Sequence, residues 1–171
     1  MPGWFDKRVE EDMLKLSLVA LLASVSAAPA AGIEGRASVI DGDTIEIHGE
    51  RIRLEGIDAP ESNQPCTHKR TGQTWRCGQQ ASIWLSDLIG ARTVSCVEAG
   101  RDRWKRMLAH CTVGGQDIGA EMVRNGWAMA FIRYSKEYVP EETEARSAGA
   151  GIWASEFDPP WDWRRAKRPP Q

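Results

Sequence analysis

Residues 37–58, ASVIDGDTIEIHGERIRLEGID, decide the fold that we expect for this chain. Apolar and polar side chains alternate in TIEIH (44–48) and again in RIRLEGI (51–57), which is the pattern of strands with one buried face. Asp41-Gly42-Asp43 and His48-Gly49-Glu50 supply the turns between strands. The stretch therefore predicts three consecutive strands, the last two of which form a hairpin.

The rest of the chain predicts two more strands and about three helices. The spacing of Ala81, Trp84, Leu85, Leu88 and Ile89 gives one apolar helical face, which ends at Gly90. Residues 93–97 and 107–113 are β runs that flank a polar, basic segment at 98–106. A second helix begins at the cap Asp117 and ends near Asn125, and a third spans Pro140 to Ser147.

Strands that come in runs, with helices inserted later, favour a closed barrel over a parallel sheet with crossover helices. The fold class that we predict is mainly β with α additions: a five-stranded antiparallel OB-type barrel. A length of 171 residues suits one domain. The net charge of -2 gives no support to a polyanionic partner, so a nucleic-acid function has to be argued from local residues.

The N-terminal region resembles an export signal. Residues 16–31, LSLVALLASVSAAPAA, are uncharged, follow Lys15 and end in small residues, which is typical of a signal peptide. The run is shorter than the about 20 apolar residues of a membrane span. We therefore predict a signal peptide over residues 1–30, periplasmic or extracellular localisation, and no stable membrane association after cleavage. Acidic residues before Met13 fit this reading poorly, which makes Met13 an alternative start; a buried or membrane-anchoring helix is the alternative structure.

Four cysteines follow the predicted signal. In an exported chain an even count favours disulfides, and we predict the local pairs Cys66–Cys77 and Cys96–Cys111. The first pair would close the polar loop at 62–78, and the second would link two strands. Zinc bound by Cys66, His68 and Cys77 is the alternative, although the sequence offers no evident fourth ligand.

Acidic residues flank the predicted hairpin. Asp41 and Asp43 occupy the first turn, and Asp58 and Glu61 follow the third strand. A hairpin brings the start of one strand beside the end of its partner, so we expect Asp43 to lie near Asp58. Clustered carboxylates repel unless a cation compensates them, and hard oxygen ligands suit Ca²⁺ or Mg²⁺. Each acid taken alone is equally typical of a turn or a cap.

Basic residues complete a possible phosphate site. Arg53 points away from the core face of its strand, and the segment before the fifth strand holds Arg101, Arg103, Lys105 and Arg106. Guanidinium groups match phosphate oxygens and can neutralise the charge that develops in phosphoryl transfer. A solvated basic loop, and for Arg53 a surface ion pair, are the alternatives.

Three segments resemble the signatures of the staphylococcal nuclease (thermonuclease) family: VIDGDT at 39–44, RLEGIDAPE at 53–61 and DRWKRMLA at 102–109. MVRNGWA at 122–128, with 144–146 and 151–153, resembles the later helices of that family. The resemblance covers about residues 37–153, and the combination of motifs in this order is far more specific than any motif alone.

The resemblance implies an OB-fold enzyme that hydrolyses DNA and RNA with Ca²⁺ and little sequence specificity. It implies calcium ligation by Asp43, Asp58 and the backbone carbonyl of Ala59. Glu61 would position or deprotonate the attacking water, and Arg53 and Arg106 would hold the scissile phosphate. We expect a monomeric nuclease domain over residues 31–156.

The chain departs from the family pattern where Trp104-Lys105 replaces the usual Tyr-Gly. Trp104 can still stack on a base, but Lys105 stands where a glycine permits an unusual backbone angle, which bears on the aim of Arg106. We take Trp104, Lys105 and Tyr134 as candidate substrate-binding residues. The tail at 157–171, rich in Pro, Trp and Arg, is predicted to be irregular.

Two other functions compete with the nuclease hypothesis. One is a non-catalytic OB-fold module that binds nucleic acid or a protein, and the other is a small interaction domain stabilised by zinc or disulfides. The chain keeps every side chain that the chemistry requires, namely Asp43, Arg53, Asp58, Glu61 and Arg106. A module that only binds has no need of this full set, so the sequence favours the enzyme.

Overall fold

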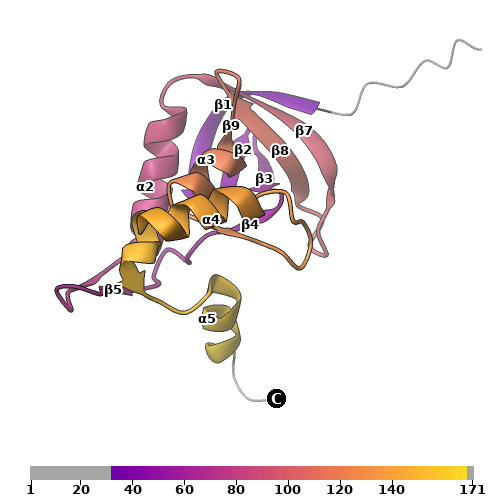
Figure 1. Cartoon of the computed structure of the whole chain (residues 1–171). Helices are drawn as coiled ribbons and strands as arrows, with labels where there is room; N and C mark the ends of the chain where they lie inside the picture. The colour runs from indigo at the N-terminus through magenta and orange to yellow at the C-terminus, as the bar shows by residue number, and fades with distance from the viewer. Residues whose placement is uncertain (1–31, 169–171) are drawn as a thin grey trace, which may run out of the picture.

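A computed structural model of the protein describes residues 32–168 (Figure 1). The predicted signal peptide at 1–30 lies outside the described residues. Five strands form the barrel in the order β3-β2-β1-β7-β8, and β3 pairs with β8 to close it. These strands are β1 (Gly32–Asp41), β2 (Thr44–Ile47), β3 (Glu50–Leu54), β7 (Thr93–Arg101) and β8 (Met107–Val113). The predicted five-stranded OB-type barrel is confirmed.

The closing pair of strands corrects one part of the prediction. β3 and β8 run parallel, with Ile52 opposite Met107, whereas the other barrel pairs are antiparallel. A long connection, which includes helix α2 (Cys77–Ile89) and strand β7, lies between them and gives the chain room to return in the same direction. The barrel is therefore mixed rather than fully antiparallel.

Strand β1 serves two neighbours. It begins at Gly32, five residues earlier than the predicted first strand, and its first half pairs with β7 while its second half pairs with β2. The predicted hairpin of β2 and β3 is confirmed, and Thr44 lies opposite Arg53. This register brings the turn at Asp43 beside the end of β3, where Leu54 donates its N–H to the Asp43 carbonyl at 2.9 Å.

Three helices cover the barrel at the predicted places (Figure 1). They are α2, α3 (Ile118–Arg124) and α4 (Val139–Ala148). Their inward residues, such as Leu85, Met122 and Ala145, are buried, as are the barrel residues Ile45 and Ile52. Asp117 caps α3 as predicted, because its carboxylate accepts the Ala120 N–H at 2.9 Å.

Short strands attach the connecting segments to the barrel. β4 (Ile57–Asp58) pairs with β10 (Met129–Ala130), and β9 (Gln116–Asp117) extends β8. The predicted surface loop at 62–78 contains β5 (Cys66–His68) and β6 (Thr74–Trp75), and β5 also pairs with β11 (Ser155–Glu156) after the single-turn 3-10 helix η1 (Gly151–Ala154). The loop is therefore anchored to the C-terminal part of the fold.

Both predicted disulfides are present. Cys66 is bonded to Cys77, and Cys96 is bonded to Cys111 across the antiparallel pair β7–β8. The two cysteines of the zinc alternative are buried in the first of these bonds, with 1% and 0% exposure. The zinc hypothesis is therefore wrong.

The C-terminal tail is ordered where an irregular segment was predicted. Residues Pro160–Ala166 form helix α5, with Pro160 in the first turn and buried. Trp161 stacks on Phe131 with ring centroids 5.7 Å apart and an interplanar angle of 12°. Figure 1 shows α5 below α4 and the barrel, next to the C-terminus. Proline at the first helical turn was a usable signal, but α5 is short and its position depends on this tertiary contact.

Within residues 32–168, the helices are all too short or too polar to cross a membrane.

Candidate active site

Asp43 lies at the turn that follows β1 and is almost fully buried, with 4% exposure. Its N–H donates to Asp41 Oδ1 at 3.0 Å, which closes the turn. Its own carboxylate accepts the Thr44 hydroxyl at 3.1 Å and the Ala59 N–H at 3.0 Å. The turn is thus tied to the segment that follows β4, and the predicted approach of Asp43 to the Asp58 region is confirmed.

Arg53 joins the two buried aspartates. Its Nη1 lies 2.7 Å from Asp43 Oδ1 and its Nη2 lies 2.8 Å from Asp58 Oδ1. Asp58 has 0% exposure and is held in the β4–β10 pair. The Arg53 side chain is only 16% exposed, so the prediction's alternative of a surface ion pair for this residue is wrong.

The electrostatics of this cluster follow from burial and crowding. Burial raises the pKa of the Asp58 carboxyl and Asp43 adds to that effect, while Arg164 and Arg53 oppose it. Burial, followed by the charge of Asp43, raises the pKa of Asp41 to about 6. Burial acts to lower the pKa of Arg53, but the two carboxylates outweigh it and raise that pKa. The carboxylates of this cluster outnumber its arginines, and an added cation would reduce the repulsion between them.

Arg164, from the C-terminal helix α5, connects Glu61 to Asp58 of the same cluster. Arg164 Nη1 donates to Glu61 Oε1 at 2.7 Å and to Asp58 Oδ1 at 3.0 Å, and its Nη2 donates to Asp58 Oδ2 at 2.6 Å. The prediction placed Arg164 only in a basic tail and missed this contact. The sequence offers no spacing signal for it, because the contact joins residues more than a hundred positions apart.

The backbone around Glu61 is fixed by close packing. Its N–H donates to the side chain of the fully buried Gln64 at 3.2 Å, and Gln64 in turn donates to the Asp158 carbonyl at 2.6 Å. Gly78, in the first turn of α2, packs directly on the Glu61 carbonyl, and an added Cβ there would lie 1.7 Å from that oxygen. The position of Glu61 therefore depends on a glycine at 78.

We expect Gly78→Ala to lower stability by about 1–3 kcal/mol, because the new methyl group must push the Glu61 backbone away. Urea unfolding measures this loss. Gln79→Ala is the matched control, since Gln79 lies in the same turn with its side chain exposed. Equal stability of the two variants would show that α2 moves without cost and that the packing on Glu61 is not restrictive.

Arg106 lies on the loop between β7 and β8 and is engaged locally. Its N–H and its Nε donate to the Asp102 carboxylate at 2.9 Å and 2.8 Å. Burial acts to raise the pKa of Asp102, but the hydrogen bonds from Arg106 and from the Trp104 N–H lower it overall. Among the described residues, Arg106 makes its ion pair with Asp102 and not with the buried carboxylates.

Lys105 has the left-handed backbone that the family's glycine would adopt easily, with φ at +66°. The expectation of an unusual angle at this position is confirmed. The loop nevertheless keeps its shape, because Lys105 donates its N–H to the Asp102 carbonyl at 2.9 Å and accepts from Arg101 at 3.1 Å.

We expect Lys105→Gly to raise stability by up to about 1 kcal/mol, because glycine adopts a positive φ without the side-chain clash. Lys136→Gly is the control: Lys136 is exposed in another loop and does not have a positive φ, so its replacement should destabilise the chain. Urea unfolding compares the two. A loss of stability in Lys105→Gly would mean that the lysine is not strained.

Two exposed aromatic side chains lie on these loops. Trp104 is 62% exposed, and the guanidinium groups of Arg103 and Arg106 lie 3.9 Å and 5.3 Å from its ring centroid. Tyr134 is 69% exposed and its ring centroid lies 4.9 Å from that of Phe131, which also carries Trp161 of α5. Trp104 therefore contacts Arg106 on its own loop, whereas Tyr134 contacts Phe131, the residue on which Trp161 of α5 stacks.

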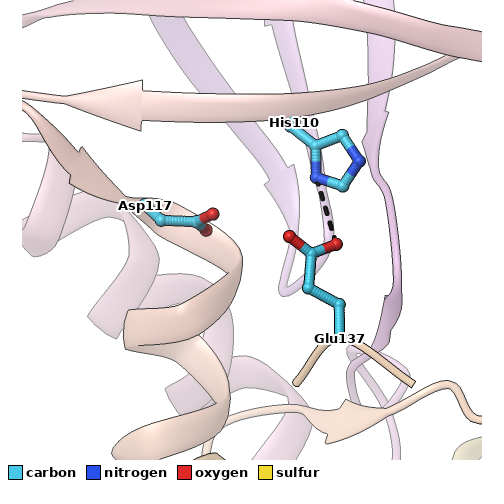
Figure 2. A group of neighbouring side chains, drawn as sticks. All are labelled: His110, Asp117 and Glu137. Carbon is cyan, nitrogen blue, oxygen red and sulfur yellow. Dashed lines mark ion pairs between the residues drawn. The ribbon is translucent and has the colours of Figure 1, made fainter. Parts of the chain in front are cut away.

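A second group of potential metal ligands contains none of the predicted site residues. Figure 2 shows His110 and Glu137 facing each other, with 3.6 Å between Nδ1 and Oε2, and Asp117 to one side at the start of α3. Ligand atoms of all three lie within 4.8 Å of one another. Asp117 already caps α3 and accepts the Tyr138 hydroxyl on both oxygens at 3.1 and 3.2 Å. These hydrogen bonds give Asp117 a structural role.

The structure combines a five-stranded OB-type barrel with two buried aspartates that Arg53 bridges. The chain matches the family described as "Staphylococcal nuclease homologue" over residues 51–155, which is more than half its length. It belongs to the staphylococcal nuclease family.

Individual relatives agree with this assignment. The chain is 41% identical over 142 residues to "Succinoglycan biosynthesis protein ExoI" of Rhizobium meliloti (strain 1021), covering 81% of this chain and 74% of the relative. It is 33% identical over 138 residues to an "Uncharacterized endonuclease" of Haemophilus influenzae, covering 76% and 71%. A further "Uncharacterized endonuclease" of Escherichia coli O157:H7 is 35% identical over 147 residues, covering 80% and 88%.

Proposed function

We propose that this protein is a calcium-dependent endonuclease that hydrolyses phosphodiester bonds of DNA or RNA with little sequence specificity. The observation that carries the proposal is a network of contacts among three carboxylates. Arg53 bridges Asp43 and Asp58. Glu61 lies close to Asp58, because one guanidinium, that of Arg164, contacts both. Family membership and the endonuclease names of two relatives support the reaction class.

The donor set fits a hard cation. Asp43 and Asp58 are buried carboxylates from two different segments, and the Ala59 N–H bond to Asp43 holds the third proposed ligand residue next to them. Oxygen ligands in a flexible, partly irregular arrangement suit Ca²⁺ better than a metal that prefers sulfur or nitrogen. Residues 32–168 place no histidine or free cysteine among these contacts, which speaks against zinc at this position.

Each remaining side chain has a separate role in the proposed reaction. Glu61 accepts a proton from the attacking water, which requires only hydrogen-bond range. Arg53 and Arg106 neutralise the charge that develops on the phosphate, the first from the barrel and the second from the loop once it leaves Asp102. Bound calcium supplies Lewis-acid polarisation of the phosphate and a lower pKa for coordinated water.

Substrate binding is assigned to the exposed loops. Trp104 and Tyr134 are exposed aromatic side chains on which bases can stack, and such stacking tolerates any base. Lys105 adds a cation beside Trp104. This arrangement accounts for loose sequence preference, because none of these groups reads a base edge.

Export and a monomeric state complete the proposal. Two disulfides are compatible with an oxidising compartment, in agreement with the predicted signal at 1–30. Calcium is abundant outside the cytosol, which suits a site built from only a few protein oxygens.

A cleavage assay tests the function. The purified protein is incubated with labelled single-stranded DNA and with RNA, in calcium or in a calcium chelator, beside the variant Arg106→Ala. We expect calcium-dependent cleavage by the wild type and a loss of at least about a hundredfold in the variant. Nucleic-acid binding without cleavage under any condition would contradict the proposal and favour a non-catalytic OB-fold module.

A further inference from the structure

The C-terminal helix α5 is seated on the candidate active site by several independent contacts. Trp161 stacks on Phe131, Pro160 is buried, and the Asp158 carbonyl just before the helix accepts from the buried Gln64. Gln64 is also the partner of the Glu61 backbone. The segment at 158–164 is therefore packed against the same residues that fix Glu61, rather than resting on an unrelated surface.

Arg164 carries its charge into the carboxylate cluster. Both of its terminal nitrogens contact Asp58, at 3.0 and 2.6 Å, and one also contacts Glu61 at 2.7 Å. Its side chain is one-third exposed, whereas Asp58 is fully buried. A single guanidinium thus satisfies both oxygens of Asp58 that a cation would use, together with the proposed general base.

Charge balance makes this contact competitive. Asp43, Asp58 and Glu61 carry three negative charges, and Arg53 offsets only part of them. Arg164 supplies one of the two positive charges still missing, and a divalent cation would supply both, but each needs the Asp58 oxygens. A guanidinium that already occupies both Asp58 oxygens and Glu61 Oε1 takes acceptor sites that a cation would use, and its positive charge would repel that cation.

We propose that α5 is an internal competitor of the catalytic cation: Arg164 occupies Asp58 and Glu61, and calcium binding requires its withdrawal. The inference rests on the proposed function, since it concerns the same cation site. By linkage, anything that unseats α5 raises calcium affinity, and calcium loosens α5. Phe131 contacts both Trp161 and the proposed substrate-binding residue Tyr134. A substrate that binds Tyr134 would therefore also affect the packing of α5 on Phe131.

Calcium affinity of the full protein, measured by titration calorimetry without substrate, tests the proposal. We expect Arg164→Gln to bind calcium about tenfold more tightly than the wild type. The reason is that the variant lacks the state in which Arg164 occupies the calcium ligands, and that state lowers the apparent affinity of the wild type. Arg165→Gln is the matched control, because it removes the same charge from the next residue, whose side chain is 74% exposed and pairs with Asp162 at 2.7 Å. Equal affinity of the two variants would overturn the proposal.

A second variant separates the helix from the charge. Trp161→Ala removes the stack on Phe131 and leaves every charge in place, so it should also tighten calcium binding, by less than Arg164→Gln. Unchanged affinity in Trp161→Ala would overturn the claim that seating of the helix controls the site. Acrylamide quenching gives a direct readout: calcium should increase the quenching of the wild type, and this increase should be smaller in Trp161→Phe, in which Trp163 is the remaining tryptophan of α5.

The outcomes distinguish this inference from the proposed function. Tighter calcium binding in Arg164→Gln together with no cleavage by any variant would retain the competition and overturn the nuclease function. Calcium-dependent cleavage together with equal affinities of Arg164→Gln and Arg165→Gln would do the reverse. Absence of calcium binding in the wild type and in Arg164→Gln would overturn both.

Discussion

Replacing Glu61 by glutamine should lower the rate of phosphodiester cleavage by about a thousandfold, which is the typical contribution of a positioned general base. Glutamine has the same size and keeps an oxygen that can accept from Arg164, so the surrounding contacts can persist. It cannot take a proton from water. Initial rates at saturating calcium and substrate measure the loss as a change in turnover.

The control for Glu61→Gln is Glu34→Gln, an exposed position on β1 that should retain the wild-type rate. Near-ultraviolet circular dichroism checks that the fold is intact in both. Cleavage by Glu61→Gln within about tenfold of the wild type would contradict the assignment of Glu61 as the base, because that residual rate exceeds what general-base loss permits.

Replacing Arg53 by methionine should lower the free energy of unfolding by about 3–5 kcal/mol in the absence of calcium. The arginine side chain is 16% exposed and bridges Asp43 and Asp58, so its loss leaves two buried carboxylates with less compensation. Calcium should restore part of the stability, because a cation that binds the folded state supplies the missing charge. Urea unfolding with calcium and with a chelator gives both numbers.

Arg51→Met is the matched control on the same strand. Arg51 is 65% exposed and pairs with Glu46 at 3.7 Å, so its loss should cost less than about 1 kcal/mol and should not depend on calcium. If Arg53→Met were no less stable than Arg51→Met, the aspartates would not need the arginine. If calcium failed to reduce the difference in unfolding free energy between Arg53→Met and Arg51→Met, the cluster would not be a cation site.

The barrel could be predicted because its strands carry local signals. Alternation in β2 and β3, two glycine turns and the clean run at Met107–Val113 set the strands and the hairpin register. That register alone placed Asp43 beside the end of β3. The parallel closure of β3 on β8 carries no such signal, because strand direction at a barrel seam depends on the path of the whole chain.

The candidate site was predictable only in part. Asp43, Arg53 and Asp58 lie on the hairpin and its exit, so sequence position and strand pairing bring them together. Arg164 was missed because it reaches the site from a seven-residue helix whose position is fixed by an aromatic stack and by the buried Gln64, neither of which has a sequence period. The basic tail was visible in the sequence, but its destination was not.

The most direct test of the central claim measures calcium binding and calcium-dependent cleavage on the same preparation, in the wild type and in Asp43→Asn. The account predicts that cleavage rises in proportion to calcium occupancy, stops in a chelator and returns when calcium is added back. It also predicts that Asp43→Asn weakens binding and cleavage together. Cleavage that persists in the chelator, or that is lost in Asp43→Asn while calcium affinity is unchanged, would contradict it.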